Sequence, residues 1–210
     1  MNDTPSEPDE YNQYPLPLHI IHRYWADPWD GANDPQTYLD DDPRGSELLV
    51  EVVKRHVPPG GRILEIGCNA GRNLDHLYRN GYTDIEGVEI SAKAVAALRE
   101  AFPNMPITLF HGPVELIIKE MPDNDYDLVF SMAALEHIHY DSNWIFAEMV
   151  RITRGFILTL EDERGISMRH FPRNYAEMFE PLGMEQVEQV ACQAVFGDTF
   201  EGRVFRKRNG

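Results

Sequence analysis

The hydrophobic positions of this chain fall into short continuous runs, separated by segments in which they recur with helical periodicity. The runs at 63–66, 126–131 and 156–160 show almost no polar alternation, which is typical of strands buried on both faces of a parallel sheet. Weaker runs at 84–90 and 106–110 predict two further strands. The pattern therefore predicts a central, mainly parallel sheet.

Between these strands, hydrophobic residues at three- and four-residue spacing predict helices, and Ser46 and Ser91 stand where N-caps are expected. The predicted helices are 46–56, the segment after Gly71, 92–102, the segment that reaches Met121, 141–153 and 172–180. Alternation at 184–190 and 200–206 predicts a closing antiparallel hairpin. This order predicts an α/β fold: a Rossmann-like, doubly wound, seven-stranded sheet with helices on both faces and a C-terminal antiparallel hairpin.

The composition divides the chain into three parts. Residues 1–14 are polar, acidic and rich in proline, and we expect them to form a disordered tail. Residues 15–45 carry Trp25, Trp29 and other aromatic side chains among prolines, which indicates either a lid over a ligand or a strap packed on the surface. Residues 46–210 are expected to form the main domain.

Charge and cysteine content narrow the possible partners and compartment. The formal net charge of −16 argues against nucleic-acid binding, which requires clustered basic residues. No apolar run is long enough for a membrane span, and the N-terminus lacks the features of a secretory signal. Only two cysteines are present, Cys68 and Cys192, as expected for a protein of the reducing cytoplasm. We therefore expect a cytoplasmic protein that binds neither membrane nor nucleic acid.

The most informative segment is the glycine turn, residues 65–71, which reads EIGCNAG. Gly67 and Gly71 permit positive φ and let a ligand approach bare main chain, next to the N-terminus of the helix that follows. Dinucleotide-binding folds use the same device, so the turn alone is weak evidence. Glu89, at the end of the second strand, is placed to bind the two hydroxyls of a ribose.

These segments, together with 125–131 and 135–138, resemble the class I S-adenosylmethionine-dependent methyltransferases. The resemblance implies S-adenosylmethionine as cofactor and S-adenosylhomocysteine as product. It assigns cofactor contacts to Glu65, Gly67, Cys68, Asn69, Gly71, Asn73, Glu89, Ile90, Ser131, Met132 and Arg44. Arg23 is an alternative to Arg44 for the cofactor carboxylate, and a surface ion pair is the ordinary explanation for either residue.

The chain departs from the family pattern at two places. Asn69 stands where the family often has glycine. Gly112 and Pro113 replace an Asp-Ala pair whose aspartate contacts the adenine amine in many members, so main chain, Glu115 or water must meet that amine here.

His137 is the candidate general base, because it follows the fourth strand and matches a Glu-His pair that similar methyltransferases place near the reactive methyl group. The alternative is a histidine that hydrogen-bonds the loop and shapes the pocket. Methyl transfer otherwise requires alignment of the acceptor and exclusion of water.

A metal site formed by the acids at 161–163 with His137, His139, Asp141 and His170 is a further possibility. The chain lacks the usual Asp-Asn pair of metal-dependent O-methyltransferases, so a solvated charged loop is preferred and no metal is expected. A further possibility is that the acidic side chains at 161–163 bind a cationic acceptor such as an amine. Arg169 and Arg173 either clamp an anionic acceptor or neutralise these acids.

The sequence therefore predicts an enzyme that methylates an oxygen or nitrogen of a small-molecule acceptor. Two alternatives stay open: a protein or peptide methyltransferase, and a non-catalytic nucleotide-binding Rossmann-like domain. The sequence does not determine the oligomeric state or the identity of the acceptor.

Overall fold

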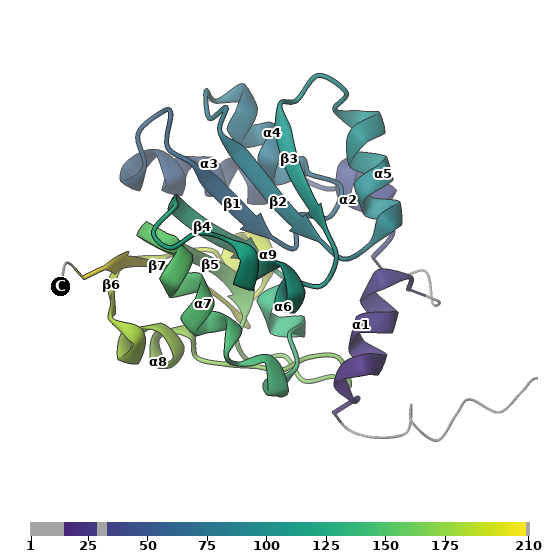
Figure 1. The fold of residues 1–210 in the computed structure, drawn as a ribbon, viewed down its shortest axis with the longest axis vertical. Coiled ribbons are helices and arrows are strands. Elements are labelled where there is room, and N and C mark those ends of the chain that lie inside the picture. The colour runs from purple at the N-terminus through teal and green to yellow at the C-terminus, as the bar shows by residue number, and fades with distance from the viewer. Residues whose placement is uncertain (1–14, 29–32, 209–210) are drawn as a thin grey trace, which may run out of the picture.

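A computed structural model describes residues 15–28 and 33–208, so the expected tail at 1–14 and Trp29 lie outside the described residues. Its core is one seven-stranded sheet in the order β3-β2-β1-β4-β5-β7-β6 (Figure 1). The strands are β1 Ile63–Ile66, β2 Ile85–Glu89, β3 Ile107–His111, β4 Tyr126–Met132, β5 Thr153–Asp162, β6 Met184–Val190 and β7 Phe200–Lys207. The first five are parallel, and β7 pairs antiparallel with both β5 and β6. The predicted fold class, hairpin included, is confirmed.

β1 and β2 both lie inside the sheet, with a strand on either side. Every residue of both strands is buried, because helices cover both faces. β3, at the end of the sheet, is only half buried. β5 is longer than predicted because its pairing with β7 continues through Glu161 and Asp162.

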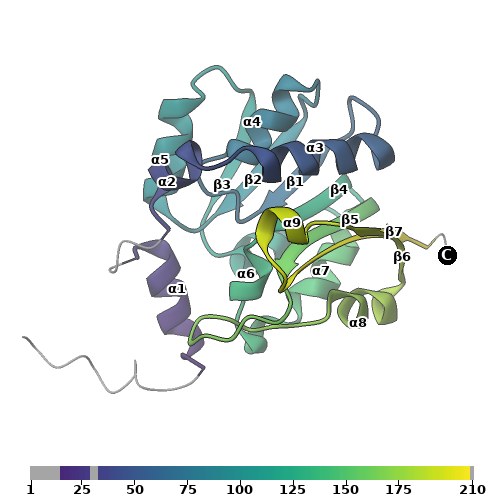
Figure 2. The same ribbon diagram turned by 180° about the vertical axis from the view of Figure 1, so that it is seen from behind.

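The helices form a layer on each face of the sheet (Figures 1 and 2). On one face, α3 Arg44–His56, α4 Arg72–Arg79 and α5 Ala92–Ala101 pack on a hydrophobic cluster that includes Leu49, Leu74 and Leu98. On the other face, α6 Val114–Ile117, α7 Ile145–Ile152 and α8 Tyr175–Phe179 pack on a second cluster around Phe146 and Phe179.

Some predicted helix ends differ from the structure. Ser91 caps α5 as expected, since its side chain accepts a hydrogen bond from the Ala94 amide. Ser46 does not cap α3, which begins at Arg44; Ser46 lies one turn further on, and its hydroxyl donates to Asn73 Oδ1 at 2.7 Å. The helix predicted at 141–153 is a 3₁₀ turn, Tyr140–Ser142, followed by α7. The sequence also did not predict the short helix α9, Gln193–Phe196.

The N-terminal segment contributes α1 Leu18–Ala26 and α2 Pro35–Asp40. Leu16, Ile20 and Ile21 form a small hydrophobic cluster with Phe171, a residue of the loop after β5. The Leu16 amide also donates to the Met168 carbonyl at 3.2 Å. These contacts fix α1 beside that loop.

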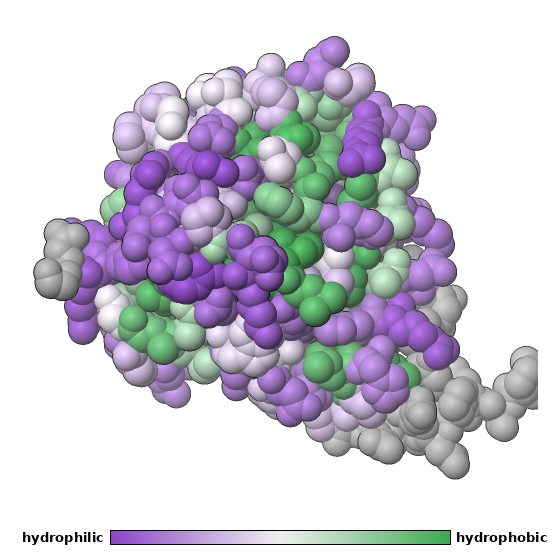
Figure 3. Space-filling view, viewed as in Figure 1, coloured by the Kyte–Doolittle hydropathy of each residue, from purple (hydrophilic) through white to green (hydrophobic). Residues whose placement is uncertain are grey.

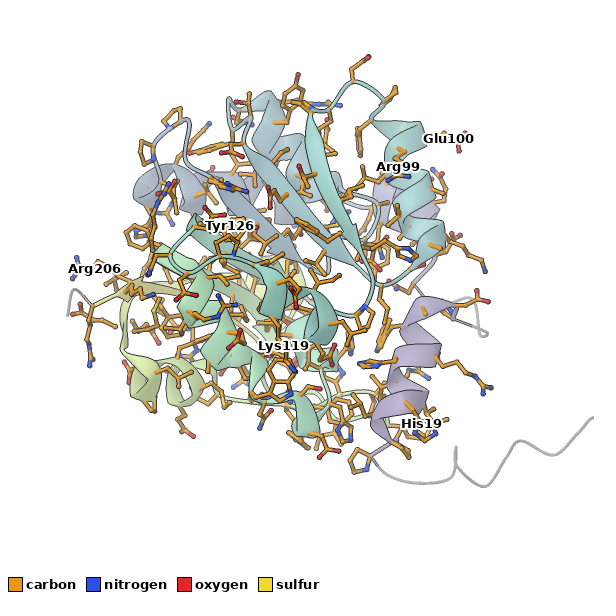
Figure 4. All side chains as sticks on the ribbon, viewed as in Figure 1. His19, Arg99, Glu100, Lys119, Tyr126 and Arg206 are labelled. Carbon is orange, nitrogen blue, oxygen red and sulfur yellow. The ribbon has the colours of Figure 1, made fainter. Side chains whose placement is uncertain are left out.

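One buried charge inside the sheet is fully compensated. Glu86 accepts hydrogen bonds from Arg62 Nη2 at 2.8 Å and from the Tyr126 hydroxyl at 2.5 Å. Both carboxylate oxygens are therefore satisfied where water is excluded. Tyr126 lies over the central strands in Figure 4, whereas His19 and Arg206 point outward from the periphery.

On the face drawn in Figure 3, hydrophobic residues gather over β2, β3 and α6, and the region beside them is mostly hydrophilic. Among the described residues, no helix has the length and apolar character needed to cross a bilayer.

Gly67→Ala should destabilise the fold far more than Gly81→Ala. Both glycines have positive φ, which costs a side-chain-bearing residue about 1–2 kcal/mol. A Cβ at position 67 would also lie 2.4 Å from Ala134 Cβ, whereas one at 81 meets nothing within 4 Å. Overpacking adds about 1–3 kcal/mol. Urea unfolding of both variants measures the difference, and equal losses would contradict the close packing at Gly67.

Candidate functional site

A cavity of about 260 Å³ opens at the carboxyl ends of β1, β2 and β4, which is where open α/β sheets bind ligands. Most of the residues predicted to contact the cofactor line it, and so does His137. These residues are Glu65, Gly67, Cys68, Asn69, Asn73, Glu89, Ile90 and Met132. The residues at 112–115, which follow β3, also line the cavity.

The glycine turn bends sharply where β1 ends. Gly67 and Gly71 have φ of 76° and 77°, and Gly71 is the N-cap of α4. Asn69 adopts a φ of 44°, a conformation that asparagine tolerates better than most residues. Its Oδ1 accepts from the Ala70 amide at 2.7 Å, and its Nδ2 donates to Asn33 at 2.9 Å. Asn69 therefore stabilises the turn and joins it to the N-terminal segment.

Glu89 links the turn to the next helix. One carboxylate oxygen accepts from the Asn69 amide at 2.8 Å, and the other accepts from the Ser91 amide at 2.7 Å. Burial raises the pKa of Glu89, and the backbone hydrogen bonds oppose that rise. Each oxygen keeps a second lone pair, so the carboxylate can still accept from a ligand hydroxyl.

Glu65 lies at the floor of the cavity with 1% of its surface exposed. Its Oε1 accepts from Asn73 Nδ2 at 2.7 Å. Its Oε2 is buried and has no hydrogen-bond partner among the described residues. Burial raises the pKa of Glu65 to about 8, so this carboxyl group is largely protonated at neutral pH. A cation bound in the cavity would lower that pKa.

Three residues predicted to contact the cofactor do not line the cavity. Gly71 allows close packing instead, because a Cβ there would lie 2.5 Å from Leu98. Ser131 is completely buried within β4. Arg44 is exposed at the start of α3 and pairs with Asp42 at 2.6 Å. Arg44 therefore forms a surface ion pair in the structure, which is the alternative to a cofactor contact that the sequence left open.

Arg72 is the cationic residue that the sequence analysis missed. It lines the cavity from the first turn of α4, and its Nη1 donates to the Tyr38 carbonyl at 2.8 Å. It also lies 3.5 Å from Asp41. Its position directly after Gly71, at a helix N-terminus, is the signal that could have identified it.

His137 lines the cavity from the 3₁₀ turn Leu135–His137, which follows β4, and the region around it is a second end of the cavity besides the glycine turn. Its Nδ1 is 3.0 Å from the Arg169 carbonyl, which assigns the proton to Nδ1 and leaves a lone pair on Nε2. Burial lowers the pKa of His137 to about 4. The ring is therefore neutral at pH 7, available as a hydrogen-bond acceptor but weak as a base.

The N-terminal segment covers this end of the cavity. The Trp25 ring packs on the His137 ring with centroids 4.2 Å apart. His22 Nε2 lies 2.9 Å from Glu115 Oε1; burial acts to raise the pKa of Glu115, but the His22 contact and backbone hydrogen bonding lower it overall. Asn33 and Tyr38 line the cavity nearer the glycine turn. The sequence analysis singled out this aromatic segment without identifying these individual contacts.

The acidic side chains at 161–163, at the end of β5, do not form a solvated loop. Glu161 is completely buried, and its Oε2 accepts from the amides of Ala134 and Glu136 at 3.1 Å each. Burial and the nearby Glu136 raise the pKa of Glu161. Glu163 pairs with Arg203 at 2.7 Å. The expectation of a solvated charged loop is wrong for Glu161, because antiparallel pairing extends β5 over it.

Arg173 is held mainly by backbone contacts. It is buried and donates to the backbone carbonyls of Phe171 and Ile138, both at 2.7 Å. It therefore fixes the loop after β5, and the charge of Glu161 also acts on it. Arg169 packs over the Tyr24 ring, with its guanidinium carbon 4.0 Å from the ring centroid.

Comparison with known proteins agrees with this geometry. Residues 64–155 match a family described as "Methyltransferase domain". A 2-methyl-6-phytyl-1,4-hydroquinone methyltransferase of Synechocystis is 28% identical over 135 residues, 63% of this chain and 41% of the relative. A ribosomal protein L11 methyltransferase of Ralstonia nicotianae is 30% identical over 135 residues, 55% of this chain and 45% of the relative. The chain thus spans less than half the length of these relatives.

Solved structures share the fold. Burkholderia thailandensis 1,6-didemethyltoxoflavin-N1-methyltransferase has a TM-score of 0.70 at 15% identity, covering 100% of this chain and 94% of the other. Magnesium protoporphyrin IX methyltransferase from Synechocystis has a TM-score of 0.71 at 12% identity, covering 91% and 100%. Both contain bound S-adenosylhomocysteine. The family match identifies residues 64–155 as similar to a methyltransferase domain, and these two structures share the fold of this chain.

Proposed function

We propose that this chain transfers the methyl group of S-adenosylmethionine to an oxygen or nitrogen of a small-molecule acceptor. The observation that carries the proposal is the joint position of two buried carboxyl groups, Glu65 and Glu89, beside the glycine turn in one cavity. A sulfonium nucleoside offers a cation and a ribose diol, which are the partners that such groups bind.

In the proposed complex the cofactor follows the carboxyl ends of β1 and β2. The ribose hydroxyls donate to Glu89, and the adenine lies against the residues at 112–115. The ammonium group of the methionine part donates to the unpartnered Oε2 of Glu65. The carboxylate of that part faces Arg72, which takes the role that the sequence analysis gave to Arg44.

The acceptor enters beside Trp25 and His137, a region that we name the acceptor end of the cavity. His137 accepts a hydrogen bond from the acceptor through Nε2 and aligns the attacking atom with the methyl carbon. Helices α1 and α2 act as a lid that excludes water, since they contribute His22, Trp25 and Tyr38 to the cavity wall. A cavity covered in this way favours a small acceptor.

A protein acceptor is the second candidate. Its support is the relative of Ralstonia nicotianae, whose name assigns it to ribosomal protein L11. Under that alternative α1 must move away from His137 to admit a side chain from another protein.

Titration calorimetry with S-adenosylhomocysteine and with NAD tests the cofactor assignment. We expect S-adenosylhomocysteine to bind and NAD not to compete. Glu89→Ala should weaken S-adenosylhomocysteine binding at least tenfold, because it removes the ribose contact and the tie to the Asn69 amide. Glu188→Ala, at a carboxylate that pairs with Arg55 far from the cavity, is the control. Preference for NAD would contradict the assignment.

Binding should release a proton near neutral pH. In the free protein Glu65 has a pKa of about 8, and an ammonium group beside it favours the ionised form. S-adenosylhomocysteine affinity should therefore rise as the pH increases toward 8 and level off above it. Calorimetry at pH 7 in buffers of different ionisation enthalpy should detect release of about one proton. Glu65→Gln should abolish this release, and an unchanged release would exclude Glu65 as its source.

A screen of candidate acceptors with labelled methyl donor identifies the substrate. Once the substrate is known, His137→Ala should lower kcat by about 10²-fold. This is the low end of the range for groups that transfer protons, because the pKa of His137 is about 4. Trp25→Ala should mainly raise the KM of the acceptor. Affinity for S-adenosylhomocysteine is the internal control and should change little in either variant. Wild-type turnover in His137→Ala would remove the residue from the mechanism.

A further inference from the structure

Three side chains, Glu136, His137 and His170, converge next to the cavity, and His137 of this group also lines it. Each offers one ligand atom, and these atoms all lie within 4.8 Å of one another. His137 Nε2 is 3.5 Å from Glu136 Oε1, and His170 Nε2 is 3.3 Å from the same oxygen. The sequence analysis grouped His137 and His170 with the acids at 161–163 and did not include Glu136.

The spacing of these atoms matches the ligands of a small divalent metal. With metal–nitrogen and metal–oxygen bonds of about 2.0–2.2 Å, two ligands of a tetrahedral site lie about 3.3–3.5 Å apart. Both measured distances to Glu136 Oε1 fall in that interval. Asp162 Oδ2 lies 3.8 Å from His170 Nε2 and offers a further oxygen at the margin of the site.

The surrounding hydrogen bonds hold the ligand atoms in the orientation that a metal requires. His137 donates its Nδ1 proton to the Arg169 carbonyl, which directs the Nε2 lone pair toward Glu136. A backbone carbonyl in this position is the usual outer partner of a metal-binding histidine. Glu136 Oε2 accepts from the Asp162 amide, which leaves Oε1 for the site.

His170 supplies an independent indication. Its Nε2 is buried and, within the described part of the chain, makes no hydrogen bond, although it lies 3.3 Å from Glu136 and 3.8 Å from Asp162. The Glu136 contact raises the pKa of His170, so the free protein can hold a proton at this position, and a metal ion would replace that proton between the same carboxylates.

We propose that Glu136, His137 and His170 bind a divalent transition metal, with Zn²⁺ as the test ion, next to the acceptor end of the cavity. Two imidazoles and one carboxylate form a ligand set for zinc or iron, whereas Mg²⁺ prefers oxygen ligands. The proposal rests on the proposed methyltransferase function for its role, because it places the metal where the acceptor enters.

With the metal bound, His137 serves as a ligand and no longer takes the acceptor proton. A metal held by Glu136, His137 and His170 would lower the pKa of an acceptor hydroxyl beside it, so that the hydroxyl would lose its proton to water. The oxygen then attacks the methyl carbon. The carbon–sulfur bond breaks, its electron pair stays on sulfur, and S-adenosylhomocysteine leaves.

Titration of tag-free, chelator-treated protein with Co²⁺ tests the site without any assay of turnover. We expect one equivalent to bind with visible d–d absorption of low-coordinate Co²⁺, and Zn²⁺ to displace it; Mg²⁺ should not. His170→Ala and Glu136→Gln should each weaken Co²⁺ binding by at least tenfold. His56→Ala is the matched control, because His56 forms a histidine–carboxylate pair with Glu188 at 2.6 Å but belongs to no such cluster.

Absence of the d–d bands, or equal losses in His170→Ala and His56→Ala, would overturn the metal site. Glu136→Gln, which changes only one atom of the side chain, keeps the test decisive if His170→Ala fails to fold. S-adenosylhomocysteine binding is measured on the same samples. If the wild-type protein binds S-adenosylhomocysteine but no metal, only the metal site is refuted. If the wild-type protein does not bind S-adenosylhomocysteine, the proposed function is refuted.

Discussion

The carboxylate of Glu89 is the contact on which the site depends. It accepts one amide from the turn after β1 and one from the start of α5, so it sets the distance between the two segments that frame the cavity. A second chain of hydrogen bonds runs from Glu65 through Asn73 to Ser46, and it joins β1 to α4 and α3. The carboxyl group in each chain is buried, and the loss of a hydrogen bond to a buried charged group is costly.

The two ends of the cavity differ in their chemistry. At the glycine turn, buried carboxyl groups and one arginine surround the space proposed for the cofactor. At the acceptor end, the rings of Trp25 and His137 line the cavity, with Glu136 and His170 next to His137, and burial keeps His137 neutral. A sulfonium donor would thus lie beside the buried carboxyl groups at the glycine turn, and an uncharged nucleophile would lie beside the rings at the acceptor end. The N-terminal segment contributes to both ends, through Asn33 at the turn and Trp25 beside His137.

Hydrophobic patterning predicted the sheet well because buried strands are marked by local sequence. Most of the residues predicted for the cofactor line one cavity, because β1, which ends at Ile66 directly before Gly67, pairs in parallel with β2, which ends at Glu89. The direction of individual side chains depended on tertiary contacts instead. Arg44 points to solvent because α3 begins one turn earlier than Ser46 indicated. Glu136 and His170, which lie 34 positions apart, meet through tertiary contacts: the Phe171 amide donates to the Glu136 carbonyl at 2.8 Å, and Arg173 binds backbone carbonyls of both segments.

A crystal structure of the protein with S-adenosylhomocysteine tests the central claim most directly. The account predicts that both ribose hydroxyls lie within hydrogen-bonding distance of Glu89, with the ammonium group of the ligand beside Glu65 Oε2. A ligand bound elsewhere, or a Glu89 side chain turned away from the sugar, would contradict it.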